Sequence, residues 1–400
     1  MKFFLENNSI SITIAFVYMS LISSCNLFQK PENKLSYPPV WKYNFSVGYF
    51  SSINPILYED KVIYSGLDEK KNDFSANSTL EAFDKKNGRL IWKWADNIPE
   101  SFDKFKHTDT WHIHADLLYI SSGWEYAINI MNGTTRFSHN SQFFGGKSIV
   151  GYEEVIFTRF TFEDYSRETV YFSKSDFNWN ELIAFNNNDS IRYYIDHLII
   201  DGVDLLIPVL RGRQNFEPGE LIFLKYNIFK KQFTAQDTII LDKERNRFID
   251  APPVLTENSL YLSLNGTVVC VNKNNFTIIW QRETNGNSSR SGIMYADNKL
   301  YVNTEFQLYA LDAETGNILW QIDSSAGSRM QEHKGVVYYT DGISLRGVDA
   351  VSGEVLLEVE APSRATDDGA FFQPVLTIDH ENDRIYTASY THAYCYPTLR

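Results

Sequence analysis

One pattern recurs along almost the whole chain and limits what the chain can fold into. Each copy has a short aliphatic-aromatic strand, a second strand ending in Asp or Asn, a turn with Gly, and a strand that often ends in Trp. The clearest copies are Lys299–Trp320 and Val62–Trp92, and the others have their second strand at Ala127, Ala184, Tyr226, Cys270, Gly347 and Cys395. Eight copies of one supersecondary unit predict a single closed array.

Each part of the repeat has a physical reason. An Asp or Asn followed by Gly makes a tight hairpin turn, because the Asx side chain caps the backbone and Gly accepts positive φ. A small residue, Ala, Cys or Gly, occupies the middle of the second strand in seven copies, where we expect adjacent sheets to approach closely. Cys270 and Cys395 fill this position, so we expect two buried thiols and no disulfide.

The pattern resembles the PQQ-like (pyrroloquinoline-quinone-type) β-propeller repeat. Its signature Ala-x-Asp-x-x-Thr-Gly-x-x-x-Trp is matched in full by Ala310–Trp320, and by Ala82–Trp92 with one substitution. The resemblance implies four-stranded antiparallel blades around a central channel. We therefore predict an all-β, eight-bladed β-propeller over residues 37–400.

The two chain ends are predicted to share the last blade. The final copy stops at Pro397, one strand short, while Val40-Trp41-Lys42-Tyr43 has the pattern of an outer strand without a blade. An N-terminal strand that completes the last blade would remove free sheet edges, which otherwise invite aggregation.

Residues 1–24 have the features of a lipoprotein signal peptide. The apolar stretch Ile10–Ile22 is too short to span a bilayer and has the length of a secretory apolar region. It leads into Ser23-Ser24-Cys25, an ending that resembles a bacterial lipobox. We predict lipidation of Cys25, a linker at 25–36 and an outer-membrane lipoprotein of the cell envelope, facing the periplasm or the surface. An ordinary secretory peptide with a chance Cys is the alternative.

Charge narrows the range of partners. The formal net charge of −13 repels phosphate backbones, whose binding depends on Lys and Arg contacts, so we expect no nucleic-acid partner.

Long spacings between copies locate insertions, mainly in the first four blades. They fall at 65–79, 95–111, 158–180, 187–203 and 208–220. Four of these five are expected on one face of the disc, and such insertions often form the binding surface of a repeat protein. Among their aromatic residues, Trp111, Trp179 and Phe216 are candidate contacts for a protein or a sugar. The alternative is that each aromatic side chain covers its own blade.

Three arginines offer a second candidate surface. Arg290, Arg329 and Arg364 each stand in a connection that passes to the next blade. If these connections rim the channel, the guanidinium groups form a cationic patch that accepts a carboxylate or an acidic partner loop. Scattered surface arginines are the alternative.

The chain lacks part of the residue set that quinone chemistry requires. The quinoprotein alcohol dehydrogenases that share this repeat carry an adjacent Cys-Cys pair, which this chain lacks. Asp367-Asp368 could be taken for an acidic pair of a catalytic site, but a solvated loop is the commoner explanation.

His112 and His114 are expected on one face of an innermost strand, but no third ligand is evident, so we predict no metal site. We expect no cofactor and no catalysis.

The sequence supports two functions from different classes, and it supports a third function less strongly. The leading hypothesis is a non-catalytic, membrane-anchored scaffold for envelope proteins, similar to the propeller lipoprotein of the outer-membrane β-barrel assembly machinery. The second is a glycan- or ligand-binding surface lipoprotein, and the third is a PQQ-dependent dehydrogenase. The fold is shared by enzymes and binders, so it supports these functions by analogy.

Overall fold

The computed structural model describes residues 37–45, 53–68, 77–94, 111–121, 124–140, 149–161, 166–174, 177–188, 190–195, 197–212, 220–240, 251–264, 266–288, 292–325, 327–362, 371–389 and 391–400. Pro38–Arg400 forms one compact unit. The predicted signal peptide, Cys25 and the linker lie outside the described residues. All regular elements in these ranges are β-strands, and they contain no helix of the length and hydropathy needed to cross a membrane.

The strands form eight separate antiparallel sheets, each built from a contiguous stretch of chain except the last. From the inside outward, the first four blades are β2 (Ile56–Tyr58), β3 (Lys61–Asp68), β4 (Asn77–Asp84) and β5 (Leu90–Trp94); β6 (His112–His114), β7 (Leu117–Ser121), β8 (Trp124–Asn129) and β9 (Thr135–Asn140); β10 (Ile149–Tyr152), β11 (Val155–Thr161), β12 (Arg167–Ser173) and β13 (Asn180–Asn186); and β14 (Arg192–Ile195) with β15 (Ile199–Asp201), β16 (Asp204–Gly212), β17 (Glu220–Asn227) and β18 (Gln232–Ile240).

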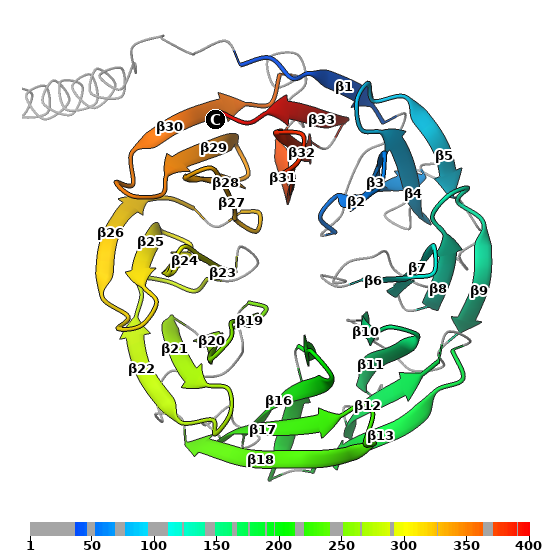
Figure 1. Cartoon of the computed structure of the whole chain (residues 1–400), viewed down its shortest axis with the longest axis vertical. Helices are drawn as coiled ribbons and strands as arrows, with labels where there is room; N and C mark the ends of the chain where they lie inside the picture. The colour runs from blue at the N-terminus through cyan, green and yellow to red at the C-terminus, as the bar shows by residue number, and fades with distance from the viewer. Residues whose placement is uncertain are drawn as a thin grey trace, which may run out of the picture. The chain divides into compact units, whose positions relative to one another are not determined.

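The remaining blades follow the same order. They are β19 (Val254–Leu255), β20 (Ser259–Leu264), β21 (Thr267–Asn272) and β22 (Ile278–Glu283); β23 (Ile293–Ala296), β24 (Lys299–Asn303), β25 (Gln307–Asp312) and β26 (Ile318–Asp323); β27 (Gln331–His333), β28 (Val336–Thr340), β29 (Ser344–Asp349) and β30 (Val355–Glu360); and β31 (Phe372–Asp379), β32 (Arg384–Ser389), β33 (His392–Pro397) and β1 (Trp41–Asn44). The eight sheets surround a central axis (Figure 1), which confirms the predicted eight-bladed propeller.

The predicted closure by the two chain ends is confirmed. β1 is the outermost strand of blade 8 and pairs antiparallel with β33, with Trp41 opposite Cys395. The ladder extends beyond β1, because the Val40 amide donates to the Cys395 carbonyl at 2.7 Å and the Phe45 amide donates to the Thr391 carbonyl at 2.9 Å.

The sequence predicts a small residue in the middle of the second strand in seven copies of the repeat, and this strand is the third strand of the blade. This prediction is confirmed in six blades. Cys270 and Cys395 are both buried and free, as expected, and burial raises the pKa of the Cys395 thiol to about 12. The placement of Ala184 was wrong, because Ala184 lies in β13, the outermost strand of blade 3. β12 takes the third place there and sets Phe172 opposite Phe157.

Two predicted insertions are also partly wrong. The segment 158–180 contains the whole of β12, and the segment 187–203 contains β14 and β15. The Asn-rich run near residue 187 resembles the Asx turn inside a blade, but it connects blade 3 to blade 4. β14 and β15 both pair with β16, so the innermost strand of blade 4 is interrupted around His197.

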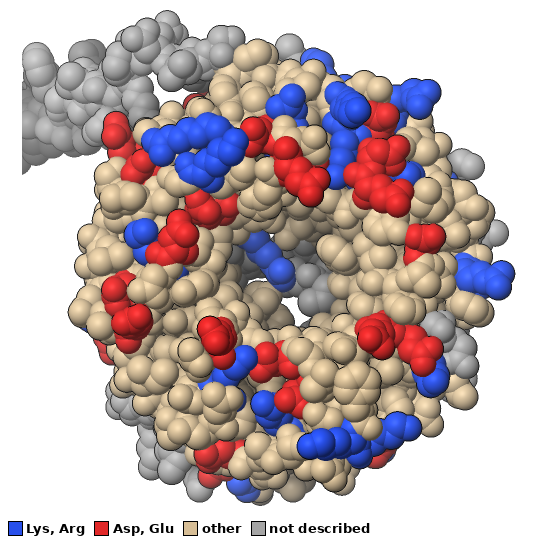
Figure 2. Space-filling view, in the orientation of Figure 1, with Lys and Arg blue, Asp and Glu red and all other residues tan. Residues whose placement is uncertain are grey.

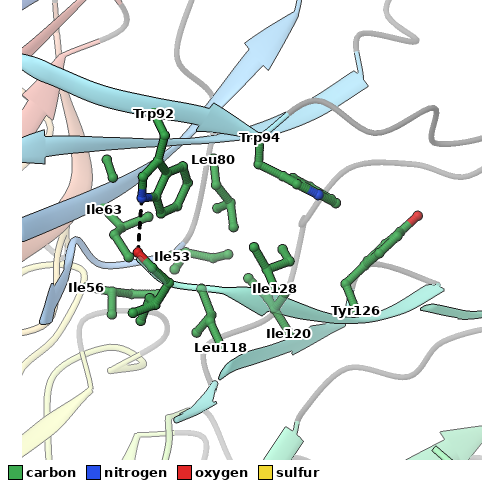
Figure 3. Packing of buried hydrophobic residues seen from close by; sticks show 12 residues of the cluster. Ile53, Ile56, Ile63, Leu80, Trp92, Trp94, Leu118, Ile120, Tyr126 and Ile128 are labelled. Atoms are coloured by element: carbon green, nitrogen blue, oxygen red, sulfur yellow. Dashed lines mark hydrogen bonds between the residues drawn. The ribbon is translucent and has the colours of Figure 1, made fainter. Parts of the chain in front are cut away.

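A tryptophan on one blade joins it to the turn of the next. In each case the indole Nε1 donates to the carbonyl of the residue after the turn Asp or Asn, and the ring lies on the turn glycine. The four contacts are Trp41 with Lys85 and Gly88, Trp92 with Ile130 and Gly133, Trp280 with Ala313 and Gly316, and Trp320 with Ala350 and Gly353. Figure 3 shows the second, where Trp92 and Trp94 cover the apolar interface between blades 1 and 2.

Blade 4 lacks this tryptophan, and blade 5 compensates for it. Ala235 stands opposite Lys225, where blade 6 has Trp320 opposite Ala310. The turn of blade 5 correspondingly has Phe276 in place of Gly, with φ of 54°. The Phe276 ring is buried and stacks on Phe223 with centroids 4.9 Å apart, filling the space that an indole takes elsewhere.

Candidate functional site

Strand direction divides the connections between two faces of the disc. Because every paired strand is antiparallel, the turns inside the inner and outer hairpins of a blade leave on one face, here called the turn face. The connections between the second and third strands, and those between blades, leave on the opposite face, here called the loop face. Trp111 and Arg329 precede the innermost strands β6 and β27 and therefore lie at the loop face.

The predicted aromatic contacts do not gather on one face. Trp111 is 37% exposed at the loop face. Trp179 stands in the turn between β12 and β13, at the turn face, because β12 occupies part of the expected insertion. Trp179 is half-buried and packs on the buried ring of Phe177 at 5.8 Å. Phe216, Arg290 and Arg364 lie outside the described residues, so their roles stay predictions.

Three nitrogen-bearing side chains from three blades are linked electrostatically, because the charges of Arg159 and Arg329 act on His197. Arg159 belongs to β11 in blade 3, His197 to the interruption of blade 4, and Arg329 to the connection into blade 7. Burial lowers the pKa of His197 to about 3, and the positive charges of Arg159 and Arg329 act in the same direction. Blades 4 and 7 are not neighbours in the ring, so Arg329 acts on His197 across the channel.

Strand alternation explains the direction of Arg159. Phe157, two residues earlier on the same face of β11, packs in one apolar cluster with Ile195 and Leu205 of blade 4. Arg159 is itself buried, and its Nη1 lies 3.7 Å from Glu168 Oε2. Figure 2 shows basic side-chain atoms inside the central opening. His197 is neutral at physiological pH, so the positive charge of this group comes from the two guanidinium groups, and the buried Glu168 carboxylate pairs with that of Arg159.

His112 and His114 lie on one face of β6, as predicted, with parallel rings 6.4 Å apart. His112 Nε2 lies 2.7 Å from the Glu153 carbonyl oxygen, and its ring fills the space beside Gly151. Burial lowers the pKa of His112. The pair therefore joins blade 2 to the inner hairpin of blade 3. Within the described ranges, no group of three or more His, Cys, Asp or Glu side chains is arranged to hold a metal.

The sequence did not predict the histidine pair His333 and His380 on the turn face. His333 Nδ1 lies 3.0 Å from His380 Nδ1, and His333 Nε2 lies 2.6 Å from Asp383 Oδ1. Lys334 Nζ is 2.7 Å from the same carboxylate oxygen. These contacts join the inner hairpins of blades 7 and 8. No local motif could reveal them, because the partners are brought together only by the neighbouring turns of two blades.

A buried carboxylate in blade 2 gives a pH-dependent contribution to stability. Glu125 is fully buried, and its Oε2 lies 3.1 Å from His139 Nδ1 on the next strand. This hydrogen bond raises the pKa of His139. The stabilisation is therefore complete below the unfolded pKa of about 6.5 and is lost as the pH rises through the higher folded pKa.

We expect the stability advantage of the wild type over His139→Gln to shrink over the pH range that begins at the unfolded pKa of about 6.5 and extends upward through the raised folded pKa. Gln keeps a hydrogen-bond donor beside Glu125 but does not titrate. Urea denaturation of both proteins across this range measures the difference, and a difference that stays constant would contradict the assignment.

Comparison with known proteins supports the assignment of the repeat. Residues 264–390 match a family model described as outer membrane protein assembly factor BamB. BamB from Moraxella catarrhalis has a similar structure, with a TM-score of 0.61 and 10% identity, covering 91% of this chain and 98% of that one. The resemblance to PQQ-like propeller repeats is confirmed.

Other PQQ-like propellers and a designed protein share the architecture. Quinohemoprotein alcohol dehydrogenase from Comamonas testosteroni gives a TM-score of 0.67 with 10% identity, covering 91% of this chain and 78% of that one. The computationally designed Ika8 protein gives 0.59 with 11% identity, covering 89% and 100%. At these identities the likeness establishes the fold. The chain has no significant match among curated protein sequences.

The cysteines of this PQQ-like propeller do not fit a quinone site. The dehydrogenase pattern needs two adjacent cysteines, but Cys270 and Cys395 lie on the third strands of blades 5 and 8. Both are buried at blade interfaces, each in a different apolar cluster. Neither thiol can therefore take part in the vicinal pair that the dehydrogenases place over the cofactor.

Proposed function

We propose that this chain is a non-catalytic, lipid-anchored scaffold that binds other proteins in the cell envelope, in the assembly of outer-membrane proteins. The observation that carries the proposal is the double likeness to BamB, by the family model over 264–390 and by a fold that covers 98% of the BamB chain. The positions of the cysteines argue against the dehydrogenase alternative.

The loop face offers the partner contact that this role requires. Trp111 is exposed there, and an exposed indole contributes strongly when a partner covers it. Arg329 precedes β27 at the same face, so the loop face combines an exposed indole with a guanidinium group. An acidic loop of a partner is the ligand that this arrangement fits, because guanidinium groups bind carboxylates with charge-assisted hydrogen bonds.

Site-specific photocrosslinking in intact cells tests the proposal. A benzoylphenylalanine is placed at position 111 or 329 on the loop face, with exposed Asn317 on the turn face as the control. We expect an outer-membrane assembly protein to crosslink at 111 and 329 and not at 317, and Arg329→Gln to weaken the crosslink from 111. Equal crosslinking at all three positions would contradict the proposal. Retention of carbohydrate without a protein partner would instead favour the glycan-binding function.

A further inference from the structure

One sector of the propeller rim exposes aliphatic and basic side chains together. It is called the rim patch here and consists of Val40, Lys42, Lys86, Arg89, Leu90 and Ile91. The patch is continuous although it comes from two blades. Trp41, between Val40 and Lys42, donates to the Lys85 carbonyl at 2.9 Å and lies on Gly88, which places β1 against the turn before β5.

The members of the rim patch are accessible. Val40, Leu90 and Ile91 are 45%, 36% and 38% exposed. Lys42, Lys86 and Arg89 are exposed too, and none of them forms an ion pair within the described part of the chain. Figure 2 shows basic side chains along the edge that carries β1 and β5, with acidic side chains beside them toward the centre of the disc.

The corresponding turn of blade 6 shows what is particular to this sector. Blade 6 exposes the aliphatic pair Ile318 and Leu319 to 44% and 51%, at the positions of Leu90 and Ile91. It has Glu314 where blade 1 has Lys86, and Asn317 where blade 1 has Arg89. Exposed aliphatic pairs therefore belong to the repeat. The cation beside the blade 6 pair, Arg282, donates to the Gly316 carbonyl at 2.7 Å and to Asn317 Oδ1 at 3.3 Å. The sector beside β1 differs because it carries three exposed cations that form no ion pair within the described residues.

We propose that the rim patch lies against the surface of an anionic lipid bilayer. Lysine and arginine beside partly inserted aliphatic side chains are what an interfacial surface needs, because the cations bind acidic headgroups while the apolar groups reach the acyl boundary. The proposal rests on the membrane anchoring contained in the proposed function.

The course of the chain selects the bilayer as the occupant of the patch. β1 is the first strand, so the segment that precedes the propeller joins it inside the rim patch. A lipid on Cys25 would hold this sector within about 50 Å of the membrane, the extended reach of the 14 residues between Cys25 and Val40. The net charge of −13 does not prevent the contact, because salt screens charges beyond about 8 Å and the bilayer senses the local cations.

This placement sets the orientation of the disc. A bilayer at the rim leaves both faces open, so Trp111 and Arg329 on the loop face stay accessible to a partner. A lipid chain alone would let the disc turn freely, whereas contact at the rim patch restricts it to an edge-on position.

Vesicle co-sedimentation tests the proposal with a chain that starts at residue 25 and carries Cys25→Ser, so that no lipid contributes. This chain keeps the whole compact unit Pro38–Arg400, which holds every described strand. We expect binding to phosphatidylethanolamine–phosphatidylglycerol vesicles, weakened by salt, and none to phosphatidylcholine vesicles. Lys86→Gln with Arg89→Gln should lower the affinity about tenfold or more, because two surface cations are lost.

The apolar contribution has a matched control in blade 6. Leu90→Ser with Ile91→Ser should weaken binding several-fold, whereas Ile318→Ser with Leu319→Ser should leave it unchanged, and denaturation midpoints check that both variants fold. Absence of binding to the anionic vesicles, or an equal loss in the blade 6 variant, overturns the proposal. Mass spectrometry of Cys25 in the membrane-extracted full chain tests the anchor separately, so failure of the rim patch is distinguishable from failure of the anchoring.

Discussion

Replacement of Trp41 by Ala is expected to destabilise the propeller by about 3 to 5 kcal/mol, the usual cost of truncating a buried tryptophan. The indole is buried, donates a hydrogen bond to the Lys85 carbonyl and packs near Tyr386, with ring centroids 6.0 Å apart. Truncation removes these contacts at the one blade whose strands come from both chain ends. Guanidinium denaturation followed by circular dichroism measures the loss.

Two variants separate burial from ring closure. Trp111→Ala makes the same change at an exposed site outside β1, and we expect it to alter stability by no more than about 0.5 kcal/mol. Trp280→Ala removes an equivalent inter-blade contact in the middle of the chain, where Nε1 donates to the Ala313 carbonyl at 2.9 Å. A larger loss for Trp41→Ala than for Trp280→Ala would measure the contribution of closure. A Trp41→Ala protein as stable as Trp111→Ala would contradict the role of β1.

The blades that the sequence predicted best are those whose turns carry both an Asx residue and Gly. Blade 6 and blade 1 follow the signature closely, and their strands begin and end where the pattern places them. The prediction for blade 3 was wrong because the Asn-rich run after Phe185 resembles the turn inside a blade, while the true outer turn, between β12 and β13, contains Trp179. Local turn chemistry located the hairpins, and it could not distinguish a turn within a blade from a connection between blades.

The group formed by Arg159, His197 and Arg329 could not be predicted from the sequence, for a different reason. Arg329 was identified by its place in a connection between blades, but nothing in the sequence relates it to Arg159 or His197. Their electrostatic coupling depends on the ring, which brings blades 3, 4 and 7 to one axis, and on the interruption of an innermost strand, where His197 is buried. Blade number could be counted from repeats, whereas contacts across the channel require the closed structure.

The turn glycines give the second large expected effect. Gly316→Ala should cost about 3 kcal/mol, from two sources: its φ of +70° strains any residue with a Cβ by about 1 to 2 kcal/mol, and the added Cβ would lie 2.6 Å from the Trp280 ring, with an overpacking cost of about 1 to 3 kcal/mol. Gly342→Ala is the matched control, because φ is +85° and no atom lies within 4 Å of an added Cβ.

The difference between the two glycine variants therefore isolates the contact with the indole, and equilibrium denaturation of both measures it. In a Trp280→Ala background, Gly316→Ala should cost only the backbone strain and become equivalent to Gly342→Ala, because the ring that the methyl group meets is gone. A Gly316→Ala penalty that is the same with and without Trp280 would show that the glycine serves the turn alone and that the tryptophan–glycine contact does not join the blades.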